Sequence, residues 1–467
     1  MFIYSLGFGL AICWLWLFYL QGPLLNPICI LWGIPQETLL RWFMSAMCVT
    51  FFILFQVVKI HSLRNKKPLM IICIILLSLG PLLLGILPVI SREYSNPIIA
   101  NVLAAVCGAA AAFFYTAWME TIGIKSLRES SVMLGIAFAF AGGVTILGGI
   151  MHYYWILPLL ILCPPISFIL MLWQVPDESS LHNEYQRIDS IKLFPGKLII
   201  LIGLIYVTGG IMLNIIGIEK SYTYIFYLSY LLYALFCPIV GFILYRHEDI
   251  DLRFIYQLVI PLALMGFLLF CFQDNPTRIG AFVLLQGGSA LLNMYVWLLF
   301  PYLSRFSTRP AAVCAFGQFI TLFSVFSGNI IADQLSAMLS GGHNVKNMAF
   351  IACVASAATI FLFPDKKETF SGWQTLFRPE PQTFELEQQQ SSPNEMKTSD
   401  SVSSLDNIPL TLREKEILIL ILKGRNGRFI SEILNISSNT VKFHMRNIYS
   451  KLSVNNRQEL LTMFENK

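Results

Sequence analysis

Long apolar stretches constrain what this chain can fold into more than any other feature of its sequence. Twelve of them are long enough to cross a lipid bilayer, which takes about 20 helical residues. They lie near residues 2–20, 39–60, 68–90, 97–119, 130–150, 153–173, 197–218, 221–245, 253–272, 279–301, 310–333 and 345–363. Membrane strands would need an alternation of apolar and polar residues that these stretches lack. The sequence therefore predicts an all-α fold built around a twelve-helix transmembrane bundle.

Composition agrees with lipid as the main solvent of the chain. Of its 467 residues 56% are hydrophobic and 13% are charged, whereas soluble domains carry about a quarter charged residues. The ten cysteines all precede residue 364 and form no Cys-x-x-Cys pair, so we expect buried free thiols. The sequence shows no phosphate-binding Gly-rich loop, metal-ligand cluster or nucleophile elbow. We therefore expect no enzyme activity, no cofactor and no metal site.

The apolar stretches fall into two sets of six, separated by one polar break. We expect an N-terminal half over residues 1–173, a central loop over 174–196 and a second half over 197–363. The first stretch starts at Met1 without a basic leader, and no small-residue cleavage site follows it, so we expect it to be retained. Two similar halves are typical of transporters that are built from repeats.

Lysine and arginine are distributed unevenly between the two sides of this topology. If Met1 lies in the cytoplasm, the cytoplasmic loops hold most of these residues, including Lys66, Lys67, Arg187 and Lys192. This bias predicts that both termini and the central loop are cytoplasmic. We expect a multi-pass protein of the bacterial cytoplasmic (inner) membrane. Six plus six helices in this orientation resemble the major facilitator superfamily, although the loop over residues 59–68 lacks the Gly and Asp of that family's usual loop motif.

The chain changes character after the last apolar stretch. Residues 364–409 are rich in Gln, Ser, Glu and Pro, which predicts a flexible linker. Residues 410–467 then predict a small domain of four short helices, near 412–423, 428–434, 437–452 and from 456 onward. Thr411 is the expected N-cap of the first helix, with Glu414 as its capping-box partner. We expect the first helix to bury Ile417, Leu420 and Ile421, and the others to bury Ile430, Ile433, Val441, Ile448 and Leu452.

The third of these helices is basic on its polar side. The segment between Glu432 and Glu459 contains no acidic residue, but it contains the basic residues Lys442, Arg446 and Lys451. Such a helix fits the major groove of DNA, where Lys and Arg neutralise phosphates and Asn, Thr and His read base edges.

Three motifs in this domain resemble the DNA-binding domain of LuxR-type transcription regulators. They are Thr-x-Arg-Glu-x-Glu at 411–416, Thr-Val-Lys-x-His at 440–444 and Lys-Leu-x-Val at 451–454. The resemblance implies a helix-turn-helix domain that binds double-stranded promoter DNA as a homodimer, with RNA polymerase as a candidate partner. The residues predicted to contact DNA are Thr411, Ser438, Thr440, Lys442, His444, Arg446, Asn447 and Lys451. By resemblance, Leu460, Leu461 and Phe464 would form the dimer surface; packing within their own domain is the alternative.

The middle of the membrane segments offers neutral polar and aromatic side chains rather than charges. A candidate cavity for a small-molecule ligand is lined by Asn214, Tyr227, Tyr230, Gln286, Asn293 and Gln318. Hydrogen bonding between helices, and simple packing for the aromatic residues, are the alternatives for the same residues.

These observations favour a membrane-embedded one-component transcription regulator, in which the bundle senses a small molecule and the C-terminal domain binds DNA. The first alternative is a transporter of the major facilitator type with a regulatory DNA-binding tail. The second is a membrane anchor that binds no ligand.

Overall fold

The chain forms two compact units, residues 1–382 and 383–467, which are treated separately. The computed structural model describes residues 2–18, 25–57, 62–90, 96–150, 153–173, 196–218, 223–246, 253–272, 275–338, 344–362, 411–422, 430, 438–452, 454 and 459–460. Every element in these ranges is helical, which confirms the predicted all-α class.

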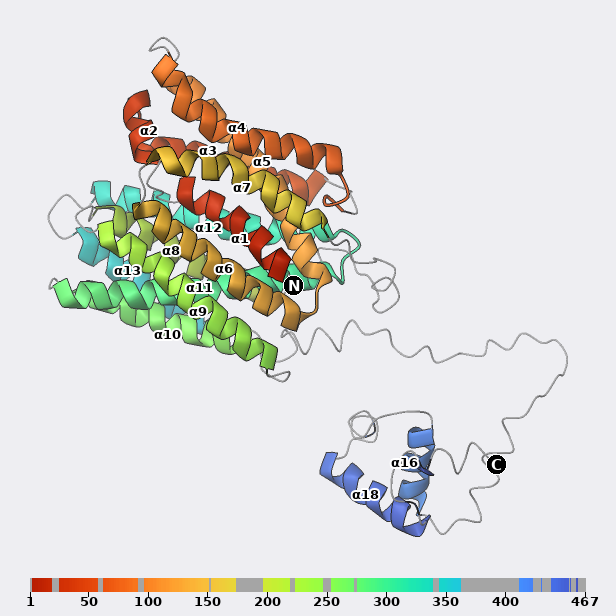
Figure 1. Cartoon of the computed structure of the whole chain (residues 1–467). Helices are drawn as coiled ribbons and strands as arrows, with labels where there is room; N and C mark the ends of the chain where they lie inside the picture. Colours follow the sequence, from red (N-terminus) through yellow and green to blue (C-terminus); the bar gives the residue numbers. More distant parts are fainter. Residues whose placement is uncertain are drawn as a thin grey trace. The chain divides into compact units, whose positions relative to one another are not determined.

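Among the residues that the structure describes, the first half of the membrane unit contains seven helices (Figure 1). They are α1 (Phe2–Phe18), α2 (Leu25–Trp32), α3 (Gln36–Val57), α4 (Lys67–Ile90), α5 (Pro97–Ile124), α6 (Leu127–Ile150) and α7 (Tyr153–Leu172). The short helix α2 was not expected from the sequence. The other six each correspond to one of the predicted apolar stretches.

In its described ranges, the second half contains six helices and a terminal turn of 3-10 helix. They are α8 (Gly196–Ile218), α9 (Thr223–Arg246), α10 (Arg253–Phe270), α11 (Asn275–Ser304), α12 (Pro310–Met338), α13 (Asn344–Ala358) and η4 (Thr359–Leu362). Eight of the described helices are long and apolar enough to cross a membrane, and α1, α7, α10 and α13 contribute shorter apolar segments. Together they account for the twelve predicted stretches and make this a multi-pass membrane protein.

Helix contacts repeat between the two halves. In the first half α1 packs against α6 and α7, and α4 packs against α5 and α7. The second half repeats this pattern, since α8 packs against α12 and α13, and α10 against α11 and α13. The halves meet along α3 and α12, along α6 and α9, and along α5 and α11 (Figure 1). This arrangement is the six-plus-six bundle that the sequence predicted.

Large apolar side chains cover the outside of the bundle. Ile72 of α4, Phe242 of α9 and Met265 of α10 are each more than half exposed. Exposing apolar side chains carries no free-energy penalty in lipid, because the lipid tails are as apolar as the side chains. The cysteines are free thiols, all buried except the half-buried Cys271 and Cys353, as expected.

The seam between α6 and α9 depends on glycine. A Cβ atom on Gly142 would lie 2.6 Å from the carbonyl oxygen of Tyr230, and one on Gly241 would lie 2.5 Å from the carbonyl oxygen of Ser131. The Ser131 hydroxyl donates a 3.2 Å hydrogen bond to the carbonyl oxygen of Gly241. Small residues of this kind let two helix backbones approach closely in a membrane.

In the C-terminal unit the structure describes two helices, α16 (Leu412–Leu422) and α18 (Ser438–Lys451). The second and fourth predicted helices lie largely outside the described residues, as does Ile433. Most of the predicted core is confirmed, because the side chains of Ile417, Ile421, Ile430, Val441, Ile448 and Leu452 are buried together. One position differs: Leu418 is fully buried, whereas Leu420 only packs against the cluster from its edge.

Candidate functional site

Helix α18 has one buried face and one polar face. Val441 and Ile448, two turns apart, are fully buried against α16. Arg446 is exposed, while Thr440, His444 and Asn447 are half-buried. Ser438 and Lys442 belong to the first turns of the same helix, but their side chains lie outside the described part. The structure therefore places seven of the eight predicted DNA contacts on this one helix, since Lys451 is its last residue.

Helix α16 begins with the predicted capping box. The Thr411 hydroxyl accepts a 3.3 Å hydrogen bond from the backbone N–H of Glu414, and the Glu414 carboxylate accepts a 2.9 Å bond from the backbone N–H of Thr411. Two backbone donors that the helix leaves unsatisfied are thus paired.

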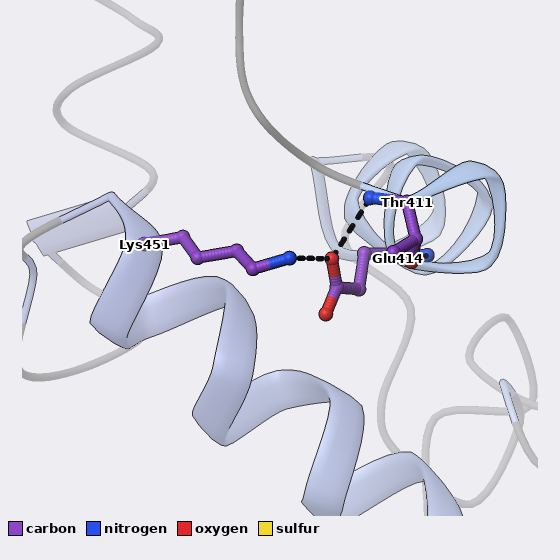
Figure 2. Close-up of polar contacts among 3 residues, drawn as sticks. All are labelled: Thr411, Glu414 and Lys451. Atoms are coloured by element: carbon purple, nitrogen blue, oxygen red, sulfur yellow. Dashed lines mark hydrogen bonds and ion pairs between the residues drawn. The ribbon is translucent and has the colours of Figure 1, made fainter.

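The same carboxylate joins the two helices. The Lys451 ammonium donates a 2.7 Å hydrogen bond to Oε2 of Glu414, the oxygen that also binds the Thr411 N–H (Figure 2). The side chain of Glu414 is 4% exposed and that of Lys451 is 36% exposed. Lys451 first, and then the Thr411 N–H, hold the pKa of Glu414 below its usual value. The last residue of α18 is therefore tied to the first turn of α16.

The hydrogen bonds of Glu414 give a structural role to two residues that were predicted to contact DNA. Thr411 caps a helix and Lys451 pairs with a buried carboxylate, so both have a structural role inside the domain. An ammonium group has three donors, and Lys451 keeps a third of its surface exposed, so contact with a phosphate stays compatible with the pair. Sequence reasoning missed Glu414 as the link, because its partner lies 37 residues away.

The predicted dimer surface is only partly described. Leu460 is fully buried and packs into the core of its own domain, which is the alternative that the sequence left open. Leu461 and Phe464 lie outside the described residues.

In the membrane unit, an aromatic cluster joins the two halves. The Trp16 ring of α1 lies 5.2 Å from the rings of Tyr230 and Tyr233 on α9, measured between centroids. Phe138 of α6 lies 6.0 Å from Trp16 and 5.9 Å from Tyr233. These are ordinary distances for favourable ring pairs.

An amide on α11 connects this cluster to α8. The Tyr206 hydroxyl of α8 donates a 2.7 Å hydrogen bond to Oδ1 of Asn293, and Nδ2 of Asn293 donates to the Tyr233 hydroxyl. Five helices, α1, α6, α8, α9 and α11, therefore meet at one set of aromatic and amide side chains, which we call the Asn293 cluster: Trp16, Phe138, Tyr206, Tyr230, Tyr233 and Asn293.

The candidate cavity residues do not all meet. Asn293 and Tyr230 belong to the Asn293 cluster, and the half-buried Tyr227 lies one turn from Tyr230. Gln286 is buried two turns along α11, and Gln318 is buried on α12 with no hydrogen-bond partner for its Nε2 in the described part of the chain. For Asn214 only the backbone, in α8, is described. No local sequence pattern indicated that Phe138 and Tyr206 would join the cluster.

Charged groups in the bundle lie near helix ends, as expected. Glu120, near the end of α5, accepts hydrogen bonds from the Ser62 hydroxyl at 3.0 Å and from the backbone N–H groups of Leu63 at 3.1 Å and Arg64 at 3.0 Å. Its carboxylate thus holds the segment that precedes α4. Arg41 of α3 forms an ion pair with Asp333 of α12, which joins the two halves.

The two units are similar to different kinds of known protein. Residues 408–464 match the family of bacterial regulatory proteins of the luxR type. The monoamine regulon transcriptional regulator of Klebsiella aerogenes is 39% identical over 70 residues, which are 15% of this chain and 31% of that protein. The transcriptional regulatory protein DesR of Bacillus subtilis is 44% identical over 59 residues, 13% of this chain and 30% of that protein. The chain thus spans about a third of the length of these relatives.

The membrane unit resembles a different kind of protein. The crystal structure of the human organic anion transporter MFSD10 (TETRAN) superimposes with a TM-score of 0.55 at 10% sequence identity, over 77% of this chain and 97% of that chain. At this identity the likeness concerns the fold alone. The protein therefore combines a LuxR-type helix-turn-helix domain, as found in bacterial transcription regulators, with a membrane bundle of the major facilitator fold.

Proposed function

We propose that this protein is a one-component transcription regulator of the bacterial cytoplasmic membrane. Its membrane bundle senses a small molecule, and its helix-turn-helix domain binds promoter DNA as a homodimer, with RNA polymerase as a further partner. Both termini lie in the cytoplasm, because the Lys and Arg bias and the need of a DNA-binding domain for the chromosome favour the same orientation. The halves span residues 1–173 and 197–363, the cytoplasmic loop 174–196, the linker 364–409 and the DNA-binding domain 410–467.

The polar face of α18 is the observation that carries this proposal. Arg446 is exposed there, beside the half-buried Asn447, and the opposite face is occupied by the domain core. We assign phosphate contacts to Lys442 and Arg446 and base-edge contacts to Thr440, His444 and Asn447. Ser438, at the start of the helix, and Thr411 are further candidates. Leu461 and Phe464 are the candidates for the dimer surface.

The bundle would act through its two halves. A ligand that binds one arrangement of the halves more tightly than another shifts the protein toward that arrangement. The change would alter the dimerisation or the release of the DNA-binding domain. The Asn293 cluster is the candidate ligand site, because it draws side chains from both halves.

A promoter reporter tests the DNA-binding half of the proposal. Lys442→Ala in the full chain should abolish regulation of the target promoter, while Lys415→Ala, on α16, serves as the matched control. Equal reporter activity in the wild type and in Lys442→Ala, at equal protein levels, would rule out regulation through α18.

A transporter with a regulatory tail is the second candidate, favoured by the likeness of the bundle to an organic anion transporter. Uptake of candidate anions into proteoliposomes that contain the full chain distinguishes the two. Accumulation against a gradient would support transport. A third candidate, an anchor that binds no ligand, predicts that an unrelated membrane anchor in place of the bundle leaves regulation intact.

A further inference from the structure

The centre of α11 carries a polar side chain that keeps accessible surface inside the bundle. Asn293 is half-buried, although its neighbours at 290–292 and 294–296 are all buried. One turn further, Trp297 is also half-buried, and its ring lies 4.9 Å from Phe8 of α1 and 6.1 Å from Tyr115 of α5. These contacts belong to the first half of the chain. At Trp297 this face of α11 therefore packs against the opposite half of the bundle, while Asn293 is bonded to α8 and α9 of its own half.

Tyr233, which is hydrogen-bonded to Asn293, belongs to a group of aromatic rings from both halves. Trp16 comes from the first half, and Tyr230 and Tyr233 come from the second, with 5.2 Å between the Trp16 centroid and each of theirs. Stacked and edge-to-face ring pairs are favourable at such distances, so the same faces can accept a ring that belongs to a ligand. A ring inserted here contacts both halves at once.

The hydrogen-bonding groups at the same place are neutral. An Asn side chain can form four hydrogen bonds, and the bonds with Tyr206 and Tyr233 account for two of them. The remaining N–H and lone pair can bind one donor or acceptor of a ligand. A charged group would lose its hydration among an amide and two phenols without gaining a counter-charge from them, whereas a hydroxyl or amide exchanges one hydrogen bond for another.

We propose that the Asn293 cluster binds an uncharged, ring-bearing molecule that carries a hydrogen-bonding group. Its ring stacks against Trp16 and the tyrosines of α9, and its polar group pairs with Asn293. This assignment rests on the proposed sensing function and names the chemical class of its ligand. It also makes Asn293 the specificity-determining residue of the site.

Ligand binding is coupled to the arrangement of the two halves because the side chains of the cluster come from both halves. Trp16 and Phe138 belong to the first half, while Tyr230, Tyr233 and Asn293 belong to the second. A ring that enters between them separates the two sets, and the seam of α6 and α9 lies beside it, since Tyr230 also meets Gly142 there. The ligand thus has different contacts in the two arrangements, which is the condition for a shift between them.

The test uses the purified full-length protein in lipid nanodiscs and three matched probes. The probes are 2-naphthol, which is neutral and forms hydrogen bonds, naphthalene, which forms none, and 2-naphthoate, which is charged. Equilibrium binding should be saturable for 2-naphthol and about tenfold weaker for naphthalene, the loss expected for one hydrogen bond. For 2-naphthoate we expect only the linear partitioning that empty nanodiscs also show.

Variants locate the site. Asn293→Leu should lower the binding affinity for 2-naphthol about tenfold and change the affinity for naphthalene by less than about twofold. Asn101→Leu, the same substitution on a half-buried residue of α5, should change neither. Trp16→Ala should weaken both probes. Tyr233→Phe keeps the ring and removes one hydroxyl, so it tests the hydrogen-bonding group if Asn293→Leu does not yield a monodisperse protein.

Three results would overturn the ligand assignment: saturable binding of 2-naphthoate as tight as that of 2-naphthol, no saturable binding of any probe, or wild-type probe affinities in both Asn293→Leu and Tyr233→Phe. The proposed regulatory function is tested separately by the Lys442→Ala reporter. If Lys442→Ala leaves the reporter unaffected while the probes bind as expected, the ligand class is supported and the proposed regulatory function is excluded.

Discussion

Lys451, the last residue of α18, donates a 2.7 Å hydrogen bond to Glu414 in the first turn of α16, and Glu414 is also the capping-box residue of that helix. One buried carboxylate therefore closes the N-terminus of α16 and holds the C-terminus of α18 (Figure 2). Helix α18 is the helix proposed to enter DNA, so its orientation within the domain depends on this contact.

Replacing the carboxylate should loosen the two helices. We expect Glu414→Gln to lower the free energy of opening of α16 and α18 by about 1–3 kcal/mol, because a charge-assisted hydrogen bond is lost. Hydrogen exchange of the backbone amides in the full chain measures this. Arg413→Gln, which removes an exposed pair with Glu416, is the control and should cost less than about 1 kcal/mol. Equal costs for both variants would mean that the Glu414 contact does not stabilise the domain.

The same contact predicts a pH dependence. The pKa of Glu414 is lowered in the folded domain, so its stabilising contribution is fully present above the unfolded pKa, about 4.3 for Glu. The contribution is lost as the pH falls through the lower, folded pKa. The stability difference between the wild type and Glu414→Gln should thus be constant at neutral pH and shrink below about pH 4. A difference that grows on acidification would show that the pKa is raised instead.

Arg446 is the exposed basic residue of α18 whose removal should weaken DNA binding without affecting the core. Arg446→Ala should reduce affinity by a similar factor for specific and random DNA, and should lower the slope of log K against log salt by about 1. Fluorescence anisotropy over a salt series measures both, with Arg413→Ala on α16 as the control. An unchanged salt slope would exclude a phosphate contact by Arg446.

Adjacent glycines in α6 provide a matched test of the seam between the halves. A Cβ on Gly142 would lie 2.6 Å from the Tyr230 carbonyl oxygen, whereas a Cβ on Gly143 meets nothing within 4 Å. We expect Gly142→Ala to destabilise the bundle by about 1–3 kcal/mol through overpacking, while Gly143→Ala is neutral or slightly stabilising. Thermal unfolding of the two purified variants compares them. Identical unfolding temperatures would contradict the close approach of α6 and α9.

The sequence predicted the elements better than their contacts. A bilayer demands about 20 apolar helical residues, so each of the long helices left a clear signal, while the eight residues of α2 were too few to leave one. The LuxR-type motifs identified the C-terminal domain because they combine capping, core and polar positions within a short segment. The core of that domain followed from helical spacing, with Leu418 in place of Leu420 as the exception.

The contacts that define the candidate sites join residues far apart in the chain. Lys451 finds Glu414 37 residues away, and Asn293 finds Tyr206 and Tyr233 at separations of 87 and 60 residues. No local pattern encodes these partners, because each depends on which helices the bundle places side by side. For the same reason, polarity alone marked Gln286, Gln318 and Asn293 equally as candidate cavity residues. Only the structure shows that Gln286 and Gln318 do not belong to the Asn293 cluster.

The central claim is that the C-terminal helix-turn-helix domain binds the chromosome while the chain remains in the membrane. Chromatin immunoprecipitation of the full-length protein, with Lys442→Ala as the matched variant, tests this most directly. We predict discrete enriched promoter fragments for the wild type, recovered with the membrane fraction, and loss of that enrichment in Lys442→Ala. Equal enrichment for the two proteins, or no enriched fragment for the wild type, would contradict the account.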